Sequence, residues 1–248
     1  MMKLLNFFKK KNNDTNALMK KKIILGILFL LPITIVLILL FTNHNYRPLP
    51  VIKQNVSELV NYSSFEGRDS IQFKGKITIL GFLGSDVKNK KINVLNLNQK
   101  IYKRFSGFKH FQLIMLVTSG QEEEIKNLKQ EISRFADEQK YWNFVVVDKD
   151  ELERVFDGLE SPLPLDEFGS SEYVYIIDKN KDLRGRIDDR TDDEIEEKAA
   201  PYMLYGYNTI LISELSGKMT DDIRILFKEY RGGKNEKSDE RRTEDLKK

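Results

Sequence analysis

Apolar positions along this chain form one long unbroken run near the N-terminus and several shorter runs after it. The long run covers 23–41, which are 19 residues without a charge. As a helix rising about 1.5 Å per residue it would span about 28 Å, close to the thickness of the hydrocarbon core of a bilayer. It is longer than the apolar core of a cleaved signal peptide, and the residues after it are bulky and polar instead of small. We therefore expect one uncleaved transmembrane helix over 23–41.

Beyond residue 60 the short apolar runs alternate with segments of helical period. Runs rich in β-branched residues and bounded by polar loops predict buried strands, and these are 76–83, 110–118, 142–147, 173–177 and 183–187. Apolar residues that recur every three or four positions predict helices, and these cover 92–105, 121–139, 148–156 and 213–230. Asp148 is the expected N-cap of the third helix. The polar residues 178–182 between the last two strands predict a hairpin turn.

The resulting order, β-α-β-α-β-(α)-β-β-α, is that of an α/β chain with a thioredoxin-like fold. Strands that alternate with helices favour a central sheet with helices on both of its faces. The expected architecture is therefore a central sheet with flanking helices, carried on one N-terminal transmembrane helix.

Charge divides the chain at the same place. The formal net charge is +3, but seven lysines against Asp14 place +6 in residues 1–22, which leaves −3 for the rest. The basicity is thus an N-terminal tail and not a nucleic-acid-binding face, so no nucleic-acid partner is expected. Lysines that precede a membrane span are typical of a cytoplasmic N-terminus lying against anionic lipid. We expect a single-pass protein of the bacterial inner (cytoplasmic) membrane, with its C-terminal domain in the periplasm.

These patterns divide the chain into five segments. Residues 47–50, Arg-Pro-Leu-Pro, are typical of an extended spacer because proline blocks helix and restricts the residue before it. Glycines at 232 and 233 end the last helix, and nearly every later residue is polar. The expected segments are a basic cytoplasmic tail 1–22, the transmembrane helix 23–41, a linker 42–60, the exported thioredoxin-like domain 61–230 and a disordered charged tail 231–248.

The residue types that carry most enzyme chemistry are scarce. The chain has no cysteine and two histidines, which excludes thiolate chemistry and a histidine metal cluster and disfavours a serine triad. No phosphate-binding glycine loop, nucleophile elbow or zinc-binding helix motif occurs in it. We expect a protein that is not an enzyme, with no catalytic residue, no cofactor and no metal site.

The segment 188–197 concentrates seven acidic residues. Negative side chains stabilise the first turn of a helix, so the simplest interpretation is a solvated helix start. A site for a cation or for a basic partner is the alternative.

Four segments, in order along the chain, carry the sequence patterns of one known family. Residues 79–90 contain Gly-Phe-Leu-Gly-Ser-Asp-Val-Lys-Asn, 142–152 contain Trp-Asn-Phe and Asp-Lys-Asp-Glu-Leu, 170–188 contain Ser-Ser-Glu-Tyr and Arg-Gly-Arg-Ile-Asp, and 221–226 contain Asp-Asp-Ile-Arg-Ile-Leu. They resemble the Gly-Phe-x-x-Cys-x-x-x-Cys-Pro, Trp-x-Phe, His-Ser-x-x-Phe and Asp-Ile-x-x-Leu segments of the Sco/SenC family of copper chaperones. The resemblance covers about residues 47–230 and implies that family's thioredoxin-like domain on a membrane anchor.

The same resemblance implies that the family's ligands are missing. Sco proteins bind copper with two cysteines and one histidine, and the matching positions here are Ser85, Asn89 and Ser170. A thiolate is the nucleophile of disulfide exchange and a soft ligand for copper(I), and neither a hydroxyl nor an amide replaces it. We expect the former ligand edge to remain as a surface that contacts a partner, with Ser85, Val87, Lys88, Asn89, Lys90 and Ser170 as the candidate contact residues.

The resemblance also implies a setting for that surface. We expect a non-catalytic, membrane-anchored Sco-like protein that binds another membrane or exported protein, either in the assembly of a respiratory complex such as cytochrome oxidase or as an accessory subunit. The alternative is an active copper carrier or a protein like a thiol-disulfide oxidoreductase, with ligands that the residue pattern does not reveal. A fold by itself does not decide between these functions.

Overall fold

The structure is a computed structural model that describes residues 21–22, 24–37, 48–68, 70–134 and 139–231. The chain divides into two units, Met1–Arg47 and Pro48–Lys248. The expected tails 1–22 and 231–248 lie outside the described residues except for positions 21, 22 and 231.

Residues 24–37 form a helix in the first unit, and the large apolar side chains along it are exposed. Thr34 Oγ1 donates hydrogen bonds back to the carbonyl oxygens of Leu30 and Leu31, at 3.0 and 2.9 Å. Position 23 and positions 38–41 of the expected membrane span lie outside the described residues. Within the part of the chain that the structure describes, no helix is long and apolar enough to cross a membrane.

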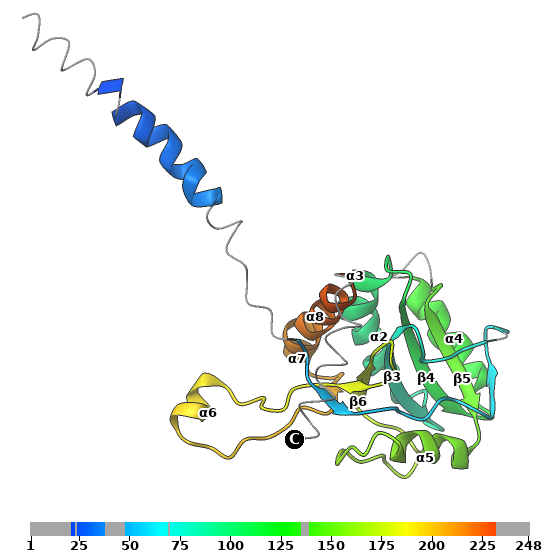
Figure 1. The fold of residues 1–248 in the computed structure, drawn as a ribbon. Helices are drawn as coiled ribbons and strands as arrows, with labels where there is room; N and C mark the ends of the chain where they lie inside the picture. The colour runs from blue at the N-terminus through cyan, green and yellow to red at the C-terminus, as the bar shows by residue number, and fades with distance from the viewer. Residues whose placement is uncertain (1–20, 23, 38–47, 69, 135–138, 232–248) are drawn as a thin grey trace, which may run out of the picture. The chain divides into compact units, whose positions relative to one another are not determined.

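One mixed sheet forms the centre of the second unit (Figure 1). Its strands are β1 (Val51–Lys53), β2 (Tyr62–Ser64), β3 (Ile77–Gly84), β4 (Phe111–Thr118), β5 (Trp142–Val147), β6 (Tyr173–Ile177), β7 (Leu183–Arg184) and β8 (Tyr207–Asn208). They lie in the order β1-β7-β6-β3-β4-β5-β2, and β8 pairs with β6. Strands β3, β4 and β5 are parallel, whereas β6 is antiparallel to β3 and β7 is antiparallel to β6.

Helices join and cover these strands. They are α2 (Lys91–Leu97), the π-helical turn η1 (Asn98–Tyr102), α3 (Lys103–Phe105), α4 (Glu122–Ser133), α5 (Lys149–Asp157), α6 (Asp192–Glu196), α7 (Ile212–Glu214), the π-helical turn η2 (Leu215–Met219) and α8 (Thr220–Arg231). Parallel strands linked by a helix, followed by an antiparallel hairpin and a closing helix, make up the thioredoxin-like arrangement. The α/β fold class expected from the sequence is confirmed.

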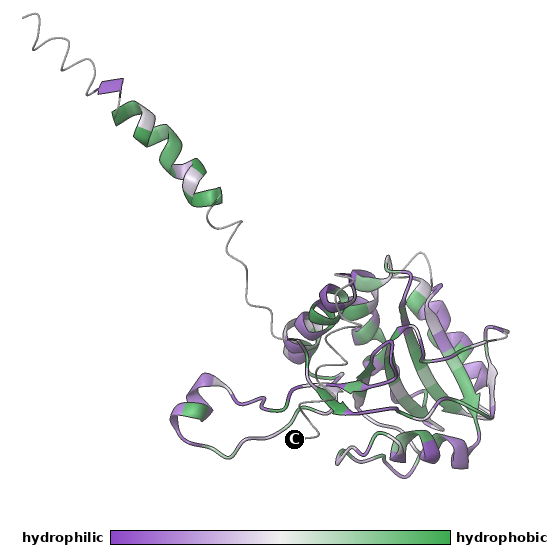
Figure 2. Cartoon of the chain, in the orientation of Figure 1, coloured by the Kyte–Doolittle hydropathy of each residue, from purple (hydrophilic) through white to green (hydrophobic). Residues whose placement is uncertain are grey.

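Side chains of β3 alternate between two hydrophobic cores, one on each face of the sheet. Ile77, Ile79 and Leu83 join the core that includes residues of α2, α4 and α8. Leu80 and Phe82 join the core that includes residues of α5. The alternation arises because successive side chains of a strand point to opposite faces, and a strand covered on both faces consists of a continuous apolar run. Figure 2 shows the result, with apolar strands at the centre and polar residues along the outer sides of the helices.

The expected linker 42–60 is too long, because its second half belongs to the folded domain. The compact unit begins at Pro48, Leu49 and Val56 are buried, and β1 pairs with β7. The backbone amide of Leu49 donates to Glu229 Oε1 in α8 over 2.6 Å. The segment that begins with Pro48 and Pro50 is therefore part of the folded domain. Residues 42–47 lie outside the described residues.

The structure departs from the apolar pattern at two places. Ile92, the first apolar residue of the helix expected at 92–105, is 61% exposed, while the adjacent Asn93 is buried and donates to Thr209 Oγ1 over 2.7 Å. An asparagine paired in this way occupies a core position that a count of apolar residues assigns to its neighbour. The strand expected at 183–187 ends at Arg184, because its pairing with β6 stops there and Arg186 pairs with Leu204 instead.

Candidate functional site

The end of β3 lies against the loop that precedes β6. Gly84, the last residue of β3, has φ +53°, and a Cβ there would lie 2.0 Å from the carbonyl oxygen of Phe168. The amide of the next residue, Ser85, donates to that same oxygen over 3.0 Å. A glycine is required here both by the left-handed backbone and by the close approach. The structure thus brings together the two loops that hold Ser85 and Ser170.

Asp166 organises the second loop. Its carboxylate accepts hydrogen bonds from Ser170 Oγ at 2.5 Å, from the amide of Ser170 at 2.8 Å and from the amide of Phe168 at 3.0 Å. Lys90 Nζ lies 3.4 Å from Asp166 Oδ2 and links this loop to the one after β3. Burial raises the pKa of Asp166, but these hydrogen bonds and the Lys90 charge outweigh it, so the pKa lies below its ordinary value of 3.8. The carboxylate is therefore held in its charged form.

Four of the six candidate contact residues reach the surface and two do not. Ser85, Lys88 and Asn89 are exposed and Lys90 is half-buried. Val87 and Ser170 are each 1% exposed, which corrects the expectation that they are available to a partner. The apolar side chain of Val87 packs into the core that contains α2 and α4, and the hydroxyl of Ser170 is turned to Asp166.

The side chains at the three positions that the resemblance matches to the Sco ligands each have a local hydrogen-bond partner. Ser85 Oγ lies 3.4 Å from the Phe168 carbonyl oxygen, and Asn89 Nδ2 donates to Asp86 Oδ1 over 2.7 Å. Ser170 donates to Asp166 as described above. Hydrogen bonds and one ion pair therefore hold these loops in place. Among the described residues, no group of three or more His, Cys, Asp and Glu side chains is placed to hold a metal ion.

A cavity of about 310 Å³ opens beside these loops at the carboxyl ends of β3, β4 and β5. In α/β sheets this edge is where ligands commonly bind. Its lining includes Ser85 after β3, Thr118 at the end of β4, Asp148 after β5, and Leu152 of α5. Phe168 also lines the cavity and is itself 48% exposed.

Phe168 is a candidate that the sequence did not reveal. An aromatic residue two positions before Ser170 gives no periodic signal, and only its exposure distinguishes it from the core phenylalanines. Asp148, by contrast, was predicted as the N-cap of 148–156. That prediction is confirmed, because its side chain accepts from the Glu151 amide over 2.7 Å at the start of α5.

The acidic segment 188–197 contains the expected helix start. Thr191 and Glu194 form a reciprocal capping box at α6. Asp189 differs from the rest of this segment, because it is buried and accepts from Lys218 Nζ over 2.5 Å.

The hairpin turn expected at 178–182 is also confirmed, with Asp178 Oδ1 accepting from the amides of Asn180 and Asp182.

The sequence matches no protein-family model, and no curated protein matches it. Solved structures with a similar fold include a SCO1/SenC family lipoprotein from Bacillus anthracis, at 16% identity and a TM-score of 0.45, covering 72% of this chain and 97% of that one. Another is BsSco, a member of the Sco family of cytochrome c oxidase assembly proteins, at 10% identity and a TM-score of 0.47, covering 73% and 98%.

A third is the thioredoxin domain of a thiol-disulfide oxidoreductase from Bacteroides vulgatus, at 18% identity and a TM-score of 0.35, covering 61% of this chain and 94% of that one. The structural neighbours are thus Sco/SenC proteins and thioredoxin-like oxidoreductases. With identities and scores this low, the strand order described above remains the basis for the fold, and function must be argued from the site.

Proposed function

We propose that this chain is a membrane-anchored, non-catalytic Sco-like protein that binds another membrane or exported protein through the edge formed by residues 84–91 and 166–172. The observation that carries the proposal is the contact between Ser85 and Phe168. It joins the loops that hold the former ligand positions, in a chain without cysteine. A respiratory setting, such as cytochrome oxidase assembly or an accessory subunit, rests on the family resemblance alone.

The composition of this edge favours protein binding over chemistry. Hydroxyl and amide groups at 85, 89 and 170 are poor ligands for copper(I) and are not nucleophiles for disulfide exchange at neutral pH. Ser85 lines the cavity together with Phe168, and the exposed Lys88 and Asn89 follow on the same loop. Aromatic side chains next to pockets are frequent anchors of protein interfaces.

The anchor and the orientation rest on the sequence. The apolar run 23–41 has the length of a bilayer span, and the lysines before it favour a cytoplasmic N-terminus. In a bacterium this orientation places the domain in the periplasm, where Sco-like proteins meet other membrane proteins. Protease added to intact spheroplasts should therefore remove the domain, and digestion only after lysis would reverse the orientation.

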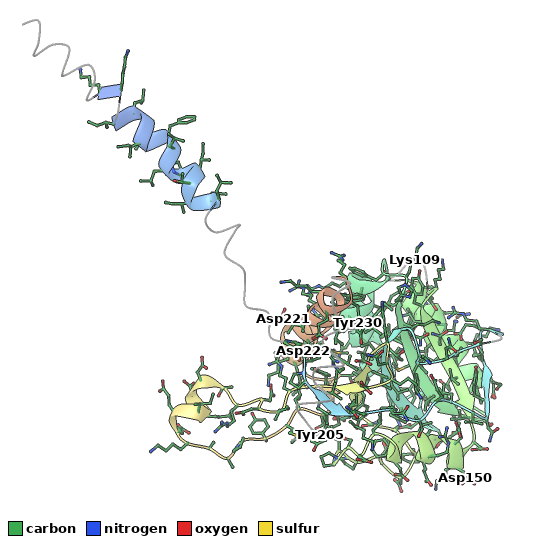
Figure 3. The ribbon with its side chains drawn as sticks, viewed as in Figure 1. Lys109, Asp150, Tyr205, Asp221, Asp222 and Tyr230 are labelled. Carbon is green, nitrogen blue, oxygen red and sulfur yellow. The ribbon has the colours of Figure 1, made fainter. Side chains whose placement is uncertain are left out.

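Site-directed photocrosslinking tests the proposed edge. A photoreactive residue replaces Lys88 in the full chain, and the matched control replaces Lys109, an exposed lysine two residues before β4. Figure 3 labels Lys109 and Asp150 at opposite ends of the sheet, and Asp150 lies in α5 next to the cavity-lining Asp148 and Lys149. A protein adduct at 88 and none at 109 is the expected result. Adducts confined to 109 would show that the former ligand edge is not used.

Copper titration of the purified full chain separates the proposal from the alternative function. We expect copper(I) binding no tighter than that of a generic protein surface, because all three soft or borderline ligands are replaced. Stoichiometric, submicromolar binding would instead support a copper carrier with ligands of another kind.

A further inference from the structure

Residues 185–206 leave the sheet after β7 and return before β8 as an arm that carries α6 near its tip. Figure 1 shows this segment extending away from the body of the domain. Its two limbs pair near the base, where the Leu204 amide donates to the Arg186 carbonyl over 2.8 Å and the Arg186 amide donates back over 3.3 Å. Farther out, the Asp189 amide donates to the Tyr202 carbonyl over 3.0 Å.

The base of the arm is clamped to the closing helix. Arg186 Nε and Nη2 donate to the two carboxylate oxygens of Asp222 in α8, at 2.8 and 3.0 Å. Asp222 also accepts from the hydroxyl of Tyr207 over 2.7 Å, and Lys218 donates to Asp189 over 2.5 Å. Asp189 and Asp222 are buried, so these charge-assisted hydrogen bonds are shielded from water.

The tip of the arm is ordered by its own bonds. Arg190 Nη1 donates to the Ala199 carbonyl over 2.8 Å, and the hydroxyl of Tyr202 donates to Glu194 Oε2 over 3.1 Å. The capping box between Thr191 and Glu194 fixes the start of α6. A surface that is already ordered loses little conformational entropy when it binds, so the arm is prepared for a partner.

Apolar side chains gather on this arm without cover. Those of Ile187, Ile195, Tyr202 and Met203 are 55%, 49%, 44% and 47% exposed. The next exposed large hydrophobic residues along the chain, Ile210, Leu211 and Ile212, follow directly after β8. In the rest of the described part of the domain, only Val60, Ile92 and Phe168 are large hydrophobic residues with comparable exposure. A concentration of this kind marks an interaction surface, whereas single exposed apolar residues are ordinary.

The charge around these side chains indicates what covers them. We count the charges along 187–205 and leave out Asp189, which is paired with Lys218. Six acidic residues and two basic ones, Arg190 and Lys198, then give a net charge of −6 + 2 = −4. Anionic lipid and a second acidic arm are both repelled by this charge, whereas a basic polypeptide is attracted.

We propose that the arm docks a segment of a partner protein that presents apolar side chains among lysines and arginines. The arm is a surface distinct from the edge formed by 84–91 and 166–172, so this inference goes beyond the proposed function and does not rest on it. The exposed apolar residues of the arm supply the buried contact. The acidic residues around them favour a partner with positive charge.

Photocrosslinking in native membranes tests this docking surface. A photoreactive residue replaces Ile195 of the full chain, and the matched control replaces Val60, an exposed apolar residue outside the arm. The adduct at 195 is expected to map, by mass spectrometry, to an apolar segment rich in lysine and arginine in another protein. Adding Glu196→Lys and Glu197→Lys should lower its yield about tenfold, which corresponds to about 1.4 kcal/mol. These two residues lie at the end of α6, where lysine is compatible with the helix dipole.

Several outcomes would overturn the inference. They are adducts with lipid, with a second copy, with this chain's own residues 1–22 or with an acidic segment, no adduct at 195, or an equal adduct at 60. If circular dichroism shows that the double lysine variant misfolds, Met203→Ser provides the second test, with the same expected loss of adduct. Crosslinks from Lys88 are scored separately, so failure of the arm and failure of the proposed function are distinguishable.

Discussion

The hydroxyl of Ser170 donates a hydrogen bond to the carboxylate of Asp166, with the two oxygen atoms 2.5 Å apart. At this position the family resemblance implies a histidine that binds copper. Here a buried serine closes a loop through an acid that also lies 3.4 Å from Lys90. Local hydrogen bonds therefore hold the two loops together in a chain without cysteine.

Removing the charge of Asp166 should weaken this loop. It should also make the unfolding free energy depend less on pH in the acid range. The pKa of Asp166 is lowered in the folded chain, so its contribution is present above the ordinary value of 3.8 and is lost as pH falls through the folded pKa. Asp166→Asn should cost about 1 kcal/mol of unfolding free energy at neutral pH, discounted for partial exposure. The cost should shrink as pH falls below 3.8 and through the lowered pKa of the folded chain.

Chemical denaturation across that pH range measures the effect of Asp166→Asn. Glu167→Gln, at the exposed neighbouring position, is the control and should change little. A variant whose stability differs from the wild type by the same amount at every pH would show that Asp166 does not titrate in this way.

Gly84→Ala should destabilise the domain and separate the loops that hold Ser85 and Ser170. The new Cβ would collide with the Phe168 carbonyl oxygen at 2.0 Å, in a backbone conformation that L residues avoid. We expect a loss of more than about 2 kcal/mol of unfolding free energy. Gly107→Ala is the matched control, since nothing lies within 4 Å of its Cβ position. Thermal or urea unfolding that found equal effects for the two variants would contradict this geometry.

The central strands were predictable because burial on both faces gives a signal within each strand. The predicted bounds of β5 and β6 match the structure, and β3 and β4 differ from it by one residue. The N-cap Asp148 was equally local, since its partner Glu151 lies three residues away. Each of these features is encoded in a few neighbouring residues.

Features that depend on distant partners were not predictable. β1 and β2 are three-residue edge strands whose pairing depends on β7 and β5. Burial of Ser170 follows from the whole loop around Asp166, and the clamp between Arg186 and Asp222 joins residues 36 positions apart. Residue types at such positions are compatible with solvent exposure, so a single sequence leaves their burial open.

Arg184→Ala should be among the most damaging single changes in the domain. Arg184 is buried and donates to Asp178 Oδ2 over 2.9 Å, and it also pairs with Glu229 of α8. Removing it leaves the fully buried Asp178 without its cation, which we expect to cost about 3–5 kcal/mol of unfolding free energy. Urea unfolding measures the loss.

The control for Arg184→Ala is Arg224→Ala, which removes an arginine paired at 3.0 Å with Asp221 on the exposed side of α8. An exposed pair contributes about 0–1 kcal/mol, so this variant should remain close to the wild type. Comparable losses in the two variants would mean that burial does not determine the contribution of the Arg184 network.

Restoring the three ligand types should create a copper(I) site. Ser85 and Asn89 are exposed and lie on the loop directly after β3, so Ser85→Cys and Asn89→Cys place two thiolates at one edge without disturbing the core. Ser170→His must break the bond to Asp166 at a buried position, so the cysteine pair should supply most of the affinity.

Competition with a chromophoric chelator should find one copper(I) per chain of the triple variant and none per wild-type chain. The double cysteine variant serves as the intermediate case. If the triple variant folds and binds no copper, the loops do not retain the geometry that the resemblance implies, or 85, 89 and 170 are not the matching positions.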